Sequence, residues 1–253
     1  MANVGSKGIV RYEETFATPT VGASGAGIAW VVSNDSGADF ARAVNTSRGL
    51  HITGVTGATA GNMTELCGDT LMFTGQTGHS SVELLVQFDV VTNLAFNFGF
   101  NDEVLETGGS ASLPMELTTT AWASNSANFL GFAFDTAADN DDLHCCWVAS
   151  NVDCATTSAT LVEGKSLRMS GIAPTADKWL YLKVEMQDRG SGNGVRATFM
   201  AADHAGRSAE KVFNTTVART TPMCFYFGLE ARTTSARNCR IKCPAWEQTI
   251  ETV

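Results

Sequence analysis

Apolar and polar residues alternate with a period of two in several short segments of the chain. The clearest segment is 179–187, where every second residue is Leu, Val or Met. This period is typical of a strand whose two faces meet different environments. A glycine-rich stretch, 188–194, follows directly, and its Asn193-Gly194 pair and two further glycines supply the positive φ angles that tight turns need. Alternation then resumes over 195–201, so the whole unit predicts a β-hairpin.

Similar runs predict further strands, and helical periodicity is weak throughout. We expect strands over 10–16, 28–33, 50–55, 70–73, 82–91, 94–100, 128–134, 224–229 and 239–242. Segment 224–229 is apolar on both faces, as in a central strand, and Pro244 is expected to stop the last strand. The best candidate helix is 36–44, which could form one or two turns.

About a dozen short strands without crossover helices predict an all-β fold. The expected architecture is a two-sheet antiparallel β-sandwich of jelly-roll topology, with the first and last strands near each other. No change in composition marks a domain boundary among the 253 residues. We therefore predict one domain over 15–253 and a polar, glycine-containing N-terminal arm over 1–14 that is suited to reach a neighbouring molecule.

The composition excludes several classes of protein. A formal net charge of −9 disfavours binding to nucleic acid. No run approaches eighteen apolar residues, which predicts that the chain does not span a membrane. No signal peptide is visible behind Met1, so we expect synthesis in the cytoplasm. The seven cysteines are an odd number, which together with this context predicts mostly reduced thiols.

Metal binding has two candidate locations. The acidic segment 135–142 could bind calcium through Asp139, Asp141 and Asp142, although its spacing differs from that of an EF-hand loop, and a solvated loop is the alternative. Zinc could be bound by residues of His144-Cys145-Cys146 with Cys154, Cys239 and Cys243. Because adjacent residues of a strand point to opposite faces, buried thiols without metal are favoured instead. We assign no cofactor.

Enzymatic motifs are missing from the sequence. There is no G-x-S-x-G, and none of the four histidines lies in a triad context. Sandwich glycosidases often carry E-x-D-x-x-E on one strand, whereas the nearest match here, Glu185-x-x-Asp188, runs into the hairpin turn. We therefore predict a protein that is not an enzyme, with no catalytic residue. The five tryptophans could provide a platform for sugar stacking, but core and edge packing is the favoured interpretation.

The segment 161–241 resembles the second half of concanavalin-like (laminin-G-like) jelly-roll domains, including those of tailed-phage virion proteins. The resemblance rests on Trp179-x-Tyr181-Leu182-x-Val184-Glu185, the glycine-rich turn, the Phe199 strand, the run Pro222 to Glu230 and the closing Arg240-Ile241. Segment 131–135, with the polar loop and the Trp147 strand that follow it, also fits. The pattern covers about half of the chain. It implies a structural protein of a virion, and it carries over no catalytic or sugar-binding residue.

Three functional hypotheses follow. The first is a capsid decoration or cement protein of a tailed phage, located on the capsid surface after synthesis in the host cytoplasm. Its partners would be the major capsid protein and copies of itself, as a homo-oligomer. The alternative is a carbohydrate-binding or host-receptor-binding module of a phage tail, which would use exposed Trp and Asn side chains on a surface glycan. A polysaccharide lyase or hydrolase on the same fold is the third possibility.

Overall fold

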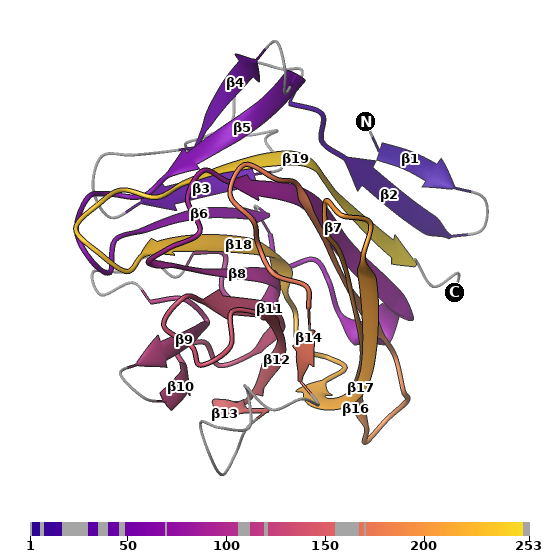
Figure 1. The fold of residues 1–253 in the computed structure, drawn as a ribbon. Helices are drawn as coiled ribbons and strands as arrows, with labels where there is room; N and C mark the ends of the chain where they lie inside the picture. Colours follow the sequence, from indigo (N-terminus) through magenta and orange to yellow (C-terminus); the bar gives the residue numbers. More distant parts are fainter. Residues whose placement is uncertain are drawn as a thin grey trace.

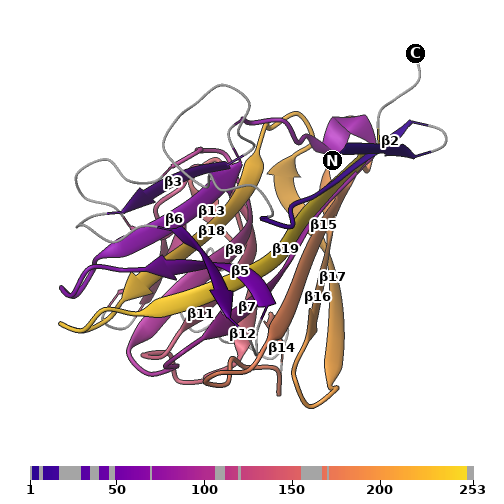
Figure 2. The same cartoon turned by 90° about the horizontal axis from the view of Figure 1, so that it is seen from above.

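The computed structural model consists of two large antiparallel sheets packed face to face, here called sheet A and sheet B (Figure 1). It describes residues 2–5, 8–16, 30–34, 40–45, 49–68, 70–105, 112–118, 121–154, 167–169 and 171–249. Figure 2 shows strands of sheet B on one side of the molecule and β15, β16 and β17 of sheet A on the other. The all-β, concanavalin-like sandwich predicted from the sequence is confirmed.

Sheet A contains nine strands. Its main order is β1-β2-β19-β7-β15-β16-β17, and β5, which also pairs with β4, is attached to β19. The bounds are β1 (Ala2–Gly5), β2 (Ile9–Glu13), β4 (Ala41–Asn45), β5 (Gly49–Val55), β7 (His79–Phe88), β15 (Leu180–Gln187), β16 (Gly194–Ala202), β17 (Ser208–Ala218) and β19 (Asn238–Thr249). A short 3₁₀ helix, η1 (Gly75–Thr77), precedes β7.

Sheet B contains eight strands in the order β13-β12-β11-β8-β18-β6-β3, and β14 pairs with β12. The bounds are β3 (Trp30–Asn34), β6 (Met63–Gly68), β8 (Leu94–Asn101), β11 (Phe129–Asp135), β12 (Leu143–Ala149), β13 (Val152–Asp153), β14 (Arg168–Met169) and β18 (Cys224–Ala231). A separate hairpin, β9 (Met115–Thr118) with β10 (Ala121–Ser124), completes the fold.

The core lies between the inner faces of the two sheets and is rich in phenylalanine. Phe96 of β8 stacks on Phe134 of β11 at 5.5 Å between ring centroids and on Phe88 of β7 at 4.9 Å. Phe132 of sheet B meets Phe199 of sheet A edge to face at 5.5 Å. Burying such side chains stabilises the fold by about 1.5–3 kcal/mol each, so this layer supplies the main attraction between the sheets.

The predicted hairpin over 179–201 is confirmed as β15 and β16, and strand 224–229 as the central β18. Residues 9–13, placed in the arm by the sequence, form β2 and pair with β19, which brings the first and last parts of the chain together as expected. Pairing β2 with β19 places this part of the arm within sheet A. Whether the arm also contacts a neighbouring molecule stays a prediction.

Three sequence-based assignments were wrong. The last strand continues past Pro244 to Thr249, because a bulge between Lys242 and Ala245 removes the proline from the hydrogen-bonded ladder. Residues 41–44 of the expected helix form β4, since pairing with β5 overrides weak local preference, while 36–39 lie outside the described residues. Segment 70–73 contributes only the single bridge Phe73–Met223.

Candidate functional site

The outer face of sheet B is covered, within the described residues, by the β9–β10 hairpin. Met115 and Trp122 of the hairpin pack on a small apolar cluster that includes Phe129, Cys146 and Tyr226. Asn97 of β8 anchors the hairpin: its Oδ1 accepts from the Met115 amide at 2.7 Å, and its Nδ2 donates to the Met115 carbonyl at 3.0 Å. The hairpin therefore covers buried polar groups on this face.

One guanidinium organises a buried ionic cluster at the edge of the hairpin. Arg232 donates from Nη1 to Glu116 of β9 at 3.0 Å and to Glu230 of β18 at 2.9 Å. Its Nε donates to Asp135, the last residue of β11, at 2.8 Å, and its Nη2 donates to the carbonyl of Leu117 at 3.0 Å. The cluster thus connects the hairpin to two strands of sheet B.

Among the described residues, the cluster contains three acids and one arginine. The pKa values of two of the acids are raised. Burial, opposed by the nearby Arg232, raises the pKa of Glu230 to about 7, and Glu116 and Asp135 add repulsion. Burial also raises the pKa of Asp135. The second carboxyl oxygen of Glu230, Oε2, is buried and has no hydrogen-bond partner in the described part of the chain. The buried pair Tyr226–Glu65, with 2.8 Å between the hydroxyl and Oε1, lies on the same face.

His144 occupies the same outer face of sheet B and lies against the hairpin. It is fully buried, its ring centroid is 5.2 Å from that of Trp122, and it is paired in register with Arg168. Burial lowers the pKa of His144 to about 4. The ring is therefore neutral at physiological pH, and it fills space under the tryptophan.

The acidic segment proposed for calcium has other partners in the structure. Asp135 belongs to the Arg232 cluster, and Asp142 accepts from the Gly171 amide at 3.0 Å and approaches Nε of Arg168 at 3.4 Å. Asp139 and Asp141 are exposed. Within the described ranges, no group of three His, Cys, Asp or Glu side chains is arranged to hold a metal ion. Calcium binding at this loop stays a prediction.

The cysteines, tryptophans and histidines mostly serve packing. None of the seven cysteines, all of them described, forms a disulfide, and adjacent Cys145 and Cys146 lie in different clusters on opposite faces of β12. Trp30 and Trp122 are buried, and Trp147 and Trp246 pack against the core. Trp179 is half-buried, with the Lys242 ammonium 4.8 Å from its ring centroid. His51, His79 and His144 lie in strands, and His204 lies in a turn.

The nearest match to a glycosidase motif does not form a site. Glu185 pairs with Lys183 at 2.6 Å, and Asp188 pairs with Arg219. The two carboxylates thus have separate cationic partners.

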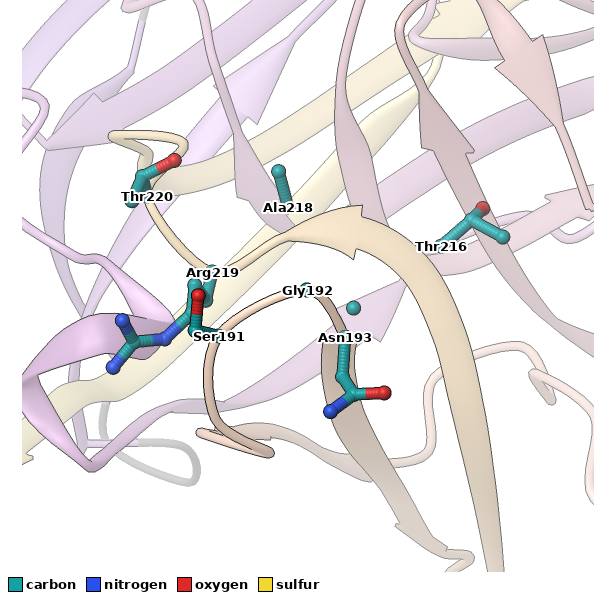
Figure 3. Close-up of a pocket in the computed structure, with 8 residues that line it drawn as sticks. Ser191, Gly192, Asn193, Thr216, Ala218, Arg219 and Thr220 are labelled. Atoms are coloured by element: carbon teal, nitrogen blue, oxygen red, sulfur yellow. The ribbon is translucent and has the colours of Figure 1, made fainter.

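An open pocket lies at one end of sheet A, where the β15–β16 turn meets the end of β17 (Figure 3). Its volume is about 340 Å³, and we call it the turn pocket. Hydroxyl, amide and guanidinium groups, together with glycine backbone, form its walls. The lining residues are Ser191, Gly192, Asn193, Gly194, Thr216, Ala218, Arg219 and Thr220.

Ion pairing and backbone bonds fix the turn pocket. Arg219 donates from Nε and Nη2 to the two carboxyl oxygens of Asp188, at 2.7 and 2.5 Å. These bonds lower the pKa of Asp188 to about 2, so the pair is charged at neutral pH. The Arg219 carbonyl also accepts from the Gln76 amide of η1 at 2.8 Å. The turn is therefore attached to Arg219 at the end of β17, and Arg219 is attached in turn to η1.

A glycine at the base of the pocket allows two strands to approach closely. A Cβ on Gly194 would lie 2.0 Å from the Thr215 carbonyl oxygen, which no side chain tolerates. The ladder is irregular here, because Gly194 pairs with Ala218 and Arg196 pairs with Asn214. The resulting bulge turns the end of β17 toward the hairpin turn.

Sequence reasoning located the turn but not the pocket. The missing element was β17, an exposed edge strand whose outward residues, apart from Val212, are polar or small. The Arg232 cluster was also missed. Its only signal was Glu230, a charged residue within the otherwise apolar strand β18.

Two stacked antiparallel sheets with this strand order define a lectin-like, concanavalin-like β-sandwich. The chain is similar to a protein of unknown function, SO2946 from Shewanella oneidensis MR-1, with a TM-score of 0.61 and 9% identity over 100% of this chain and 93% of that one. It is also similar to peanut lectin, with a TM-score of 0.54 and 8% identity over 97% and 99%.

A third similar structure is the carbohydrate recognition domain of Emp47p, with a TM-score of 0.54 and 8% identity over 88% of this chain and 89% of that one. No protein-family model and no curated protein matches the sequence. At identities this low, the likeness establishes the fold.

Proposed function

We propose that the protein is a carbohydrate-binding module and that the turn pocket is its contact site. The observation that carries the proposal is the lining of the pocket, which offers Ser191, Asn193, Thr216 and Thr220 around an open hollow. Side-chain hydroxyls and amides both donate and accept hydrogen bonds, which suits the hydroxyl groups of a sugar. The shared fold with the carbohydrate recognition domain of Emp47p supports the same class of ligand.

The charges around the pocket favour a neutral sugar. The guanidinium of Arg219 is already paired with Asp188, and the chain as a whole carries a formal charge of −9. Both features reduce the attraction for sulfated or uronic acid chains. None of the described residues that line the pocket is aromatic, so hydrogen bonds would supply most of the selectivity.

A glycan array and one paired substitution test this proposal. The wild type should bind a subset of neutral glycans, and the double variant Asn193→Ala/Thr216→Ala should lose about tenfold in affinity, because two hydrogen-bonding side chains are removed. Thr175→Ala, which changes an exposed threonine in the segment before β15, is the matched control and should bind as the wild type does. Absence of selective binding on the array would overturn the proposal.

The capsid-decoration hypothesis stays a prediction, as do the homo-oligomer, the virion location and the absence of enzymatic activity. None of the solved structures named above is described as a phage or capsid protein. We therefore place carbohydrate binding, the alternative in the sequence analysis, ahead of it.

A further inference from the structure

A second open pocket lies on sheet A, at the opposite end of the β16–β17 ladder from the turn pocket. We call it the end pocket. Its volume is about 320 Å³, and it is lined by Tyr181, Met200, Ala201, Ala202, Ser208, Ala209 and Glu210. Tyr181, Ala202 and Ser208 lie opposite one another across β15, β16 and β17, as do Met200 and Glu210. Residues directly opposite in a sheet project to the same face, so the end pocket opens on the outer face.

The turn pocket opens on that same outer face. Along β17 the outward positions are the even-numbered ones, and they stay exposed from the end pocket to the turn pocket, through the bulge opposite Gly194. These residues are all exposed: Ser208, Glu210, Val212, Asn214, Thr216 and Ala218. On β16, Arg196 and Thr198 lie beside them. Met200 of the end pocket lies six positions after Gly194 of the turn pocket along β16, which corresponds to a distance of about 20 Å.

Resting on the proposed function, we infer that the two pockets are end subsites for one extended, neutral polysaccharide chain that lies along β16 and β17. The surface between them offers hydroxyl and amide groups at Thr198, Asn214 and Thr216. Hydrogen-bonding groups spaced along a strand suit a ligand whose own hydroxyls repeat along its length.

The end pocket adds the apolar contact that the turn pocket lacks. Tyr181 is held in place because its hydroxyl donates to Glu83 at 2.5 Å, and its half-buried ring lies beside Met200. An aromatic ring and a thioether accommodate the apolar face of a sugar ring, and the exposed carboxylate of Glu210 accepts hydrogen bonds from hydroxyls. The two pockets therefore make complementary contacts.

Separation of the pockets predicts a dependence on chain length. A mono- or disaccharide reaches one pocket only, whereas a longer chain occupies both, and the second contact then forms within the same complex at high effective concentration. Affinity should rise steeply once the ligand spans about 20 Å.

Titration calorimetry with manno-, cello- and laminari-oligosaccharides of two to six sugar units tests the inference. At least one series should bind about tenfold or more tightly at six units than at two. Glu210→Ala/Met200→Ala at the end pocket and Asn193→Ala/Thr216→Ala at the turn pocket should each remove about tenfold from the affinity for the six-unit ligand. The control is Glu13→Gln, a change of an exposed residue on β2, toward the opposite edge of sheet A from β17. It should bind the six-unit ligand as the wild type does.

The results separate the two proposals. Selective array binding that the turn-pocket variant weakens, but with equal affinity for two and six units, would overturn the extended-chain inference and leave the proposed function standing. An end-pocket variant that binds the six-unit ligand like the wild type would overturn it as well. If the wild-type protein binds no glycan, both the proposed function and the extended-chain inference are overturned. Chemical denaturation of each variant shows whether a lost affinity reflects a lost fold.

Discussion

The outer faces of the two sheets differ in how far their charged side chains are exposed to solvent. On sheet A the ion pairs are partly exposed: the side chain of Arg11, paired with Glu83 at 3.0 Å, is 52% exposed. On sheet B the Arg232 cluster lies beneath a hairpin, and its Asp135 and Glu230 side chains are 1% and 3% exposed. Water screens the exposed ion pair but not the buried cluster, so a charge in the cluster has a larger effect on stability than a charge in the exposed pair.

Removing the central cation of the buried cluster should give the largest effect. Arg232→Met leaves Asp135, Glu116 and Glu230 without their shared partner, which should lower the free energy of unfolding by about 3–5 kcal/mol. Arg11→Met, the matched change on sheet A, should cost less than about 1 kcal/mol. Urea denaturation at pH 7 measures both, and similar losses in the two variants would contradict the contrast between the faces.

The proton on Glu230 gives the next effect. The ordinary carboxyl pKa of 4.5 applies in the unfolded chain, and the value of about 7 applies in the fold. The folded state binds the proton more tightly, so this stabilisation, about 3 kcal/mol, is complete below pH 4.5 and is lost as the pH rises to 7. Glu230→Gln should remove this component from a series of urea denaturations between pH 4 and 8. Parallel curves for variant and wild type would refute the assignment.

His144 should act with the opposite sign and with a similar magnitude. Its pKa falls from 6.5 to about 4 on folding, so the unfolded chain takes up the proton first. Stability from this group is complete above pH 6.5 and decreases as the pH falls toward 4, by up to about 3 kcal/mol. His144→Leu should flatten the curve in this range. NMR titration of the wild-type imidazole with a midpoint near 6.5 would rule the explanation out.

The sequence predicted the faces of sheet A better than those of sheet B. In β7 and β15 polar and apolar residues alternate, and period two is visible directly. The central strands β8, β11 and β18 are buried on both sides, so Asn97 and Glu230 stand in apolar runs with no periodic signal to mark them. The environment of Glu230 also depends on Glu116, an acid more than a hundred residues earlier in the chain, and local patterns carry no information about such distant contacts.

Local sequence patterns also predicted only part of the turn pocket. Its hairpin turn, 188–194, was predictable because asparagine and glycine favour tight turns. Its other wall was not, since Thr216 and Arg219 reach the turn only through the bulge at Gly194. Edge strand β17 was missed because its inward positions include Lys211 and Thr215 in addition to apolar residues.

The bulge at Pro244 has a consequence for how the chain assembles. One edge of β19 pairs with β7. Its other edge pairs with β5 before the bulge, over 238–241, and with β2 after the bulge, over 245–249. In sheet B, β18 holds β8 and β6 together in the same way. Residues 224–249 thus occupy a central place in both layers. During synthesis, neither layer closes until these last strands leave the ribosome, so shortened chains should display unpaired strand edges and aggregate.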